Sequence, residues 1–217
     1  MLSLNYRHVD VFSRELMSGN GLTVFQTKTE LPPVLMQAIT REMRQFESIF
    51  LVTTADPRVV RARVFTMEEE LDFAGHPVLG AAAVLHEGHF PGDDSVAWTI
   101  ELPRKTVPVT TRRTGILYRS EMDQGIAQFG HTLTDEEAKV FLRALNLDGN
   151  QLSRKFPLQQ VSTGLPYLIV PIIGGLEKAR INHADFESLL AKVGGPSLSM
   201  YSIWICERDA LGTTWGW

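Results

Sequence analysis

The segment best suited to chemistry runs from Phe73 to Val84, where a glycine-histidine-proline turn leads into apolar, mostly small residues. Pro77 suits the first position of a helix, because its missing N–H costs nothing there and its fixed φ is already helical. The free amides of a helix start attract anions, and His76 adds a hydrogen-bond donor beside Gly75. We therefore expect an anion site at Gly75 and His76. The alternative is a buried helix that follows a tight turn.

Glu47 is the second candidate, because the residues around it, Phe46 and Ile49 to Val52, are apolar. Apolar surroundings disfavour the charged form of a carboxyl, so such a group can both take and give a proton. The alternative is an exposed glutamate at a helix end. Together with Asn20 in a glycine turn and the helix start at Gly75, Glu47 suits proton transfer next to a carbonyl or carboxylate.

His86 and His89 raise the question of a metal site. They are three residues apart with Gly88 between them, whereas a helical metal pair needs a spacing of four. A metal-dependent hydrolase is therefore the weakest hypothesis, and we expect no metal, nucleotide or flavin cofactor. Cys206 is the one cysteine, which excludes a multi-cysteine metal site and a catalytic thiol pair.

The composition is that of an ordinary soluble globular protein, with 44% hydrophobic and 21% charged residues in a chain of 217. A net charge of −4 and scattered arginine pairs argue against nucleic acid or an anionic membrane as a partner. No apolar run approaches membrane-spanning length, and Met1 to Asp10 shows no signal pattern. We expect a cytoplasmic enzyme or binding protein.

The hydrophobic pattern predicts an α+β chain of two halves. Strands are expected at Tyr6–Phe12, Leu22–Gln26, Ser48–Val52 and Val59–Phe65. A helix opened by Pro32 and Pro33 places Leu35, Ile39, Met43 and Phe46 on one face. The apolar helix Pro77–His86 stops at Gly88. In the second half, Thr134 to Glu137 form a capping box before the stripe Ala138, Phe141, Leu142 and Leu145.

Three groups of residues carry a family resemblance. Val9–Phe12 with Gly19-Asn20, followed by Arg41-Glu42-Met43 and Phe46–Phe50, resembles the opening of the phenazine-biosynthesis PhzF-like family. Arg63–Thr66 with Leu71–Ala82 is similar to its second signature, and Val161–Pro166 to its second-half turn. The match extends from about Tyr6 to about Cys206.

The resemblance implies a two-lobed diaminopimelate epimerase-like fold, in which each lobe is a curved, mostly antiparallel sheet wrapped round a central helix. The N-terminal lobe would be residues 1–114 with central helix 77–86, and a partial C-terminal lobe 115–217. It also implies that Glu47 is the catalytic acid/base of an isomerase or epimerase. Asn20, Gly75, His76, Thr163 and Gly164 would bind a small carboxylate-bearing molecule.

The chain departs from the family pattern after Cys206. Family members continue with an Arg-x-Phe-x-Pro segment, an Asp-Pro-x-Thr-Gly-Ser turn and the second central helix, which have no counterpart here. We therefore expect an incomplete second lobe, and catalytic activity is in doubt. The alternative function is a non-catalytic remnant that binds small anions or a protein. An uncovered sheet face with Tyr167, Ile169, Ile203 and Ile205 would favour a homodimer.

Overall fold

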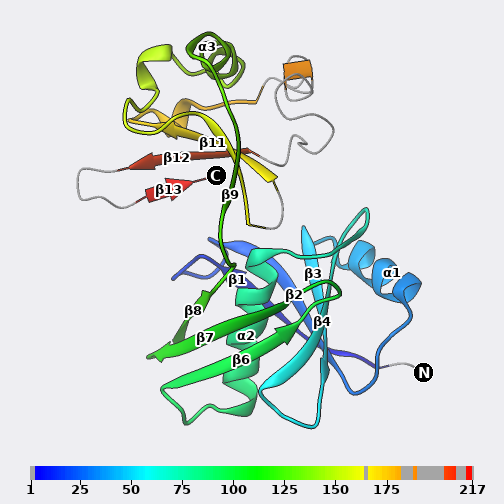
Figure 1. The fold of residues 1–217 in the computed structure, drawn as a ribbon. Coiled ribbons are helices and arrows are strands. Elements are labelled where there is room, and N and C mark those ends of the chain that lie inside the picture. Colours follow the sequence, from blue (N-terminus) through cyan, green and yellow to red (C-terminus); the bar gives the residue numbers. More distant parts are fainter. Residues whose placement is uncertain (1–2, 164–165, 182–187, 190–202, 209–213, 217) are drawn as a thin grey trace. The chain divides into compact units, whose positions relative to one another are not determined.

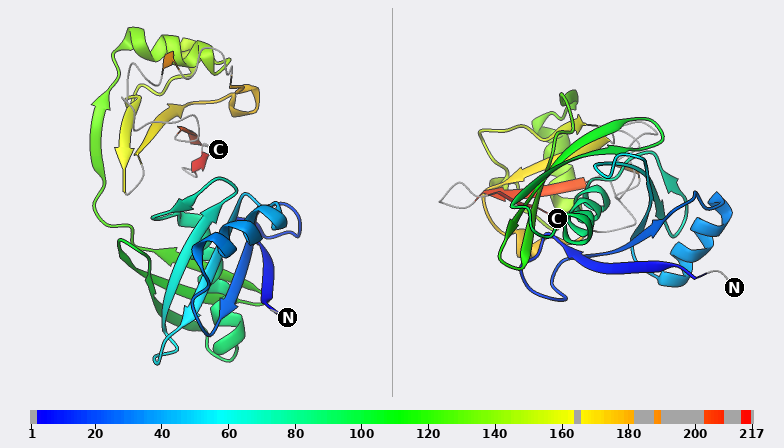
Figure 2. Two further views of the ribbon diagram at one scale, coloured as in Figure 1. Left: turned by 90° about the vertical axis from the view of Figure 1, so that its right-hand side faces the viewer. Right: turned by 90° about the horizontal axis from the view of Figure 1, so that it is seen from below.

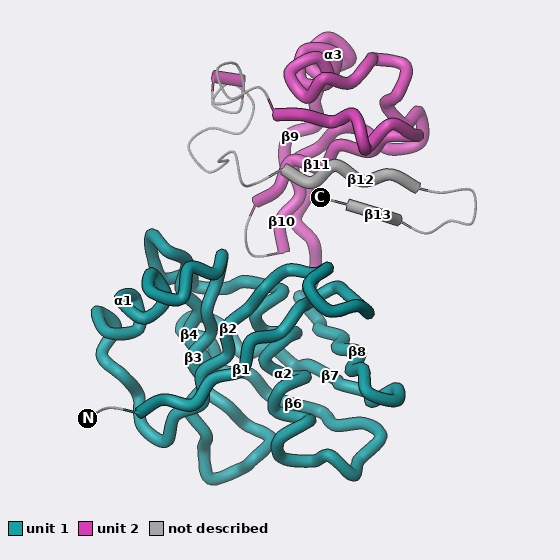
Figure 3. The backbone as a smooth tube through the Cα atoms, turned by 180° about the vertical axis from the view of Figure 1, so that it is seen from behind, with its two compact units in different colours: residues 1–124 teal, residues 125–217 magenta. Residues whose placement is uncertain are grey.

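The computed structural model describes residues 3–163, 166–181, 188–189, 203–208 and 214–216. The chain forms two compact units, Met1–Gln124 and Gly125–Trp217, and each has its own sheet (Figure 3). The division lies beyond residue 114, where the first lobe was expected to end. The reason is that β7 (Thr106–Thr114) and β8 (Leu117–Met122) pair as an antiparallel hairpin in the first sheet.

Unit 1 is an eight-stranded sheet curled round the helix α2, as the views in Figures 1 and 2 show. The strand order is β1-β2-β3-β4-β6-β7-β8, and β5 pairs with β4. The β2–β3 and β4–β6 pairs are parallel and the others antiparallel. The strands not yet given bounds are β1 (Asn5–Val11), β2 (Asn20–Thr27), β3 (Glu47–Thr53), β4 (Val59–Thr66), β5 (Glu70–Leu71) and β6 (Ser95–Glu101).

Helix α2 (Gly75–His89) is the core of unit 1. Its small and apolar residues are buried on several sides, as a helix enclosed by a sheet requires. The helix is longer than the predicted 77–86. It begins at Gly75, so Pro77 is its third residue rather than its first, and it continues through Gly88 to His89. The backbone N–H of Phe90 donates to the carbonyl of His86 and so closes the last turn.

Helix α1 (Pro33–Met43) packs on the outer face of the same sheet (Figure 1). Met36 is buried there with Phe25, Phe50 and Phe65, and Ile39 and Met43 pack beside them. The prediction that Phe46 shares this apolar face is wrong. The helix ends before it, at the left-handed residue Arg44, and the Phe46 side chain is exposed.

Unit 2 has a five-stranded sheet in the order β13-β12-β11-β10-β9. Helix α3 (Asp135–Ala144) packs its predicted stripe into the core of this unit, and Thr134 and Glu137 form the predicted capping box. The remaining elements are β9 (Gln128–Thr132), η1 (Gly149–Gln151), β10 (Gln159–Ser162), β11 (Pro166–Ile172), η2 (Leu176–Lys178), β12 (Ile203–Arg208) and β13 (Thr214–Gly216). In the described part of the chain, no helix is long and apolar enough to cross a membrane.

Candidate active site

Glu47 is the first residue of β3, and strand pairing fixes its place on both sides. It lies opposite Leu22 on β2 and opposite Thr66 on β4. Because side chains alternate along a strand, Glu47 shares its face with Ile49 and Leu51, which belong to the core round α2. The carboxyl is therefore held at the end of an apolar row, and the residue is only 6% exposed. The alternative of an exposed glutamate at a helix end is excluded.

His76, in the first turn of α2, faces this carboxyl. Its Nδ1 lies 3.2 Å from Oε2 of Glu47, and both side chains are largely buried. Neither Oε2 of Glu47 nor Nε2 of His76 has a hydrogen-bond partner within the described residues. The N-cap residue Ala74 supplies no side-chain bond to the first amides of the helix. The site thus combines a buried carboxyl, an imidazole and a helix start whose amides can bind an anion.

Burial shifts the pKa values of this pair in opposite directions. It raises the pKa of Glu47 from its ordinary 4.5 to about 7, because the carboxylate is poorly solvated. For the same reason it lowers the pKa of His76 from 6.5 to about 4. At neutral pH the imidazole is therefore uncharged, and the 3.2 Å contact is not an ion pair. Glu47 can exchange its proton near neutral pH, as a general acid/base must.

These pKa shifts predict opposite pH dependences of stability in two variants. In His76→Gln, Glu47 binds more protons in the folded than in the unfolded chain between about pH 4.5 and 7, so stability falls by about 3 kcal/mol as the pH rises through that range. In Glu47→Gln, His76 binds fewer protons when folded, so stability falls as the pH drops from 6.5 towards about 4. Urea unfolding across this range measures both slopes. Equal slopes in the two variants would contradict the assignment.

The structure places the other predicted site residues as follows. Asn20 is the first residue of β2, exposed, and two positions before Leu22, which pairs with Glu47. Gly75 is the first residue of α2. Asn20, Glu47, Gly75 and His76 therefore all belong to unit 1. Thr163 follows β10 in unit 2 and is partly buried, and Gly164 lies outside the described residues.

Three further residues, which the sequence did not suggest as site residues, adjoin the site: Phe12, Met122 and Gln124. The ring of Phe12 has its centroid 6.4 Å from that of His76, and its backbone is held at a φ of 64°. Such a conformation is uncommon for a residue other than glycine. A Cβ atom on Gly75 would lie 3.6 Å from Cε of Met122 and 3.8 Å from Nε2 of Gln124. The positive φ of Phe12 is a local property of the backbone, but the sequence around Phe12 does not reveal it.

His86 has a structural environment rather than that of a metal ligand. It is fully buried, with Nδ1 2.8 Å from the Thr111 hydroxyl and Nε2 2.9 Å from the carbonyl of Asp93. Because a carbonyl only accepts, Nε2 donates to Asp93, and Nδ1 is in hydrogen-bond contact with the Thr111 hydroxyl. Both ring nitrogens are thus occupied. No group of three potential metal-ligating side chains occurs among the described residues.

Solved structures define the fold class to which these units belong. A predicted epimerase from Pseudomonas aeruginosa is 43% identical, with a TM-score of 0.80 over 97% of this chain and 75% of its own. A probable proline racemase from Agrobacterium radiobacter is 12% identical with a TM-score of 0.59, covering 99% of this chain and 69% of its own. The latter likeness is one of fold alone. The fold is diaminopimelate epimerase-like, as predicted.

Sequence comparison defines the family more narrowly. The model of the phenazine biosynthesis-like protein family, PhzC-PhzF, matches residues 9–199, and the chain belongs to this family. The trans-2,3-dihydro-3-hydroxyanthranilate isomerase of Pseudomonas fluorescens is 31% identical over 182 residues, which are 82% of this chain and 62% of that protein. The chain spans about three fifths of the curated relatives that it matches.

Proposed function

We propose that this chain is an isomerase that moves a proton on a small carboxylate-bearing substrate. The observation that carries the proposal is the buried Glu47 oxygen beside His76 at the start of α2, which has no hydrogen-bond partner in the described part of the chain. The names of the relatives, isomerases and epimerases, agree with a proton-transfer reaction. Because the chain spans only part of those relatives, its activity is inferred from its own site.

In this reaction Glu47 is the general base and then the general acid. Its carboxylate removes a proton from a substrate carbon next to a carbonyl or carboxylate. The carboxyl so formed exchanges its proton with the solvent and delivers a proton to another carbon or another face. The negative charge that develops on the substrate is stabilised by the first amides of α2. Asn20, Gly75 and His76 hold the carboxylate group. No metal, nucleotide or flavin takes part.

The proposal extends to assembly and location. A homodimer would cover the face of the second sheet that carries Tyr167 and Ile169, which are partly buried in the structure. In the parallel β11–β12 register Ile203 pairs with Leu168 and Ile205 with Val170, not with Tyr167 or Ile169. The prediction that these four residues share one face is therefore wrong. A monodisperse monomer in light scattering would contradict the dimer. A cytoplasmic location completes the proposal.

The alternative is a non-catalytic module that binds small anions or a protein. Incubation with trans-2,3-dihydro-3-hydroxyanthranilate in deuterated water separates the two functions. We expect calorimetric binding together with uptake of deuterium at a ring carbon, detected by mass spectrometry. Binding without deuterium uptake would favour the alternative and would reject Glu47 as a proton shuttle for this substrate.

A further inference from the structure

A cavity of about 620 Å³ lies on the outer face of the unit 1 sheet. Met36, Phe50 and Val52 contribute apolar side chains to it, and charged residues of β4 and its neighbours contribute the rim. It is separate from the Glu47 site, because Glu47 points from β3 to the inner face and Phe50 to the outer. Its volume is in the range of small-molecule sites, about 300–1,000 Å³.

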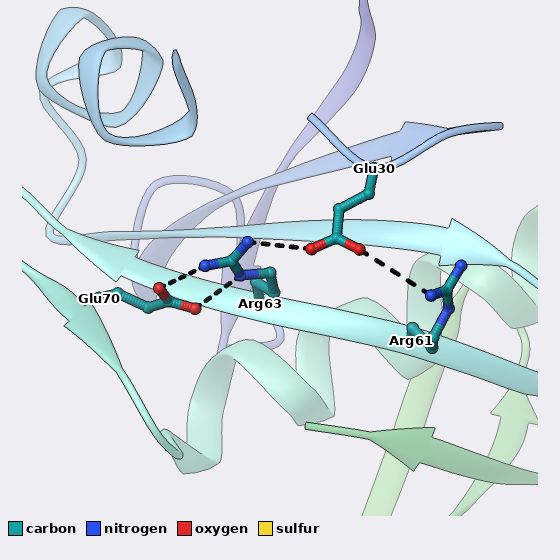
Figure 4. Close-up of polar contacts among 4 residues, drawn as sticks. All are labelled: Glu30, Arg61, Arg63 and Glu70. Atoms are coloured by element: carbon teal, nitrogen blue, oxygen red, sulfur yellow. Dashed lines mark hydrogen bonds and ion pairs between the residues drawn. The ribbon is translucent and has the colours of Figure 1, made fainter. Parts of the chain in front are cut away.

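The guanidinium of Arg63, on the rim of the cavity, is already paired with two carboxylates. Arg63 donates from Nε and Nη2 to the two carboxylate oxygens of Glu70, at 2.7 and 2.6 Å, and from Nη1 to Glu30 at 3.0 Å (Figure 4). The bidentate contact between Arg63 and Glu70 consists of two charge-assisted hydrogen bonds, which are stronger than neutral ones. Arg63 and Glu70 therefore form a fixed wall of the cavity and are not free to bind a charged ligand.

Unlike Arg63 and Glu70, Arg61 and Glu101 are not joined by an ion pair among the described residues. Arg61 lies 3.9 Å from the carboxylate of Glu30, and the arginine side chain is 55% exposed (Figure 4). Glu101 is the register partner of Arg61 across the parallel β4–β6 pair, so the two side chains leave the sheet on the same face. Both line the cavity. Among the described residues no ion pair joins Glu101 to Arg61 or to another cation.

We propose that this cavity binds an apolar α-amino acid as a zwitterion. The α-carboxylate contacts Arg61, the ammonium contacts Glu101, and the side chain lies on Leu31 and Val52. The lining carries the carboxylates of Glu30, Glu70, Asp72 and Glu101 against the guanidinium groups of Arg61 and Arg63, so it repels a simple anion. A zwitterion presents a carboxylate to Arg61 and an ammonium to Glu101 at the same time. Burial of its apolar side chain in the cavity adds to the binding free energy.

Leucine is the probe for the 217-residue chain, with N-acetyl-leucine and leucinamide as chemical controls that lack the ammonium and the carboxylate charge. We expect saturable binding of leucine, with NMR shifts at the amides of Ala62 and Leu102. Each control should bind at least about tenfold more weakly, because each lacks one of the two charged contacts. Equal binding of the three compounds, or no saturable binding of leucine at millimolar concentrations, would overturn the proposal.

Two variants test the same residues from the protein side. Arg61→Ala and Glu101→Gln should each weaken leucine binding by at least about tenfold. Arg112→Ala, at an exposed arginine of β7 outside the cavity, is the matched control and should bind leucine normally. Glu47→Gln should also bind leucine normally, which makes this test independent of the proposed isomerase. Unchanged binding in Arg61→Ala and Glu101→Gln would place leucine elsewhere.

Discussion

Replacing Glu47 with glutamine is expected to lower the rate of substrate deuterium uptake by about 10²–10⁴-fold, the usual contribution of a general acid/base. The amide has nearly the shape of the carboxyl but cannot take a proton from carbon. The change leaves the start of α2 and His76 in place, so the calorimetric dissociation constant of the substrate should change little. A fall in rate with retained binding is the result that identifies a proton shuttle.

The matched control is Glu87→Gln, at an exposed glutamate whose carboxylate lies 3.8 Å from Arg7. Its rate should equal that of the unmodified chain. Retained turnover in Glu47→Gln would reject the assignment. Loss of binding together with turnover would instead indicate that Glu47 holds the substrate without moving its proton.

Replacing Leu85 with alanine is expected to destabilise unit 1 by about 2–5 kcal/mol, the cost of removing a leucine from a packed core. Leu85 is fully buried on α2, in the cluster that the sheet encloses. Because α2 also carries His76, this cavity weakens the element that positions the site. Urea unfolding followed by tryptophan fluorescence measures the loss, since Trp98 belongs to the same cluster.

Leu16→Ala is the control of identical chemistry, because Leu16 is 91% exposed. It should change stability by no more than about 0.5 kcal/mol. Similar losses in the two variants would show that Leu85 does not pack in the core of unit 1.

The central helix α2 was predictable because its small and apolar residues indicate a buried helix. A run of small and apolar residues suits burial on all sides, and at Gly80 a larger residue would require Leu22 and Val11 to shift. A Cβ atom there would lie 2.6 Å from Cδ2 of Leu22 and 2.8 Å from Cγ2 of Val11. The exact start was mispredicted, since proline is tolerated throughout the first turn, where amides have no partner within the helix.

The site was predictable in its parts but not in its geometry. Glu47 was identified from apolar neighbours in sequence, and strand alternation shows why they bury it. Its contact with His76 depends on β3 lying between β2 and β4 and on α2 lying inside the curl, which are long-range properties. Phe12 adjoins His76 for the same reason. No local pattern in the sequence predicts these distances.

The measurement that tests the central claim most directly is the titration of the Glu47 side-chain carboxyl carbon by ¹³C NMR, assigned by its absence in Glu47→Gln. The account predicts a midpoint near pH 7, because the carboxyl is buried beside a neutral His76. A midpoint near the ordinary 4.5 would show a solvated carboxylate and would contradict the proton shuttle proposed for this site.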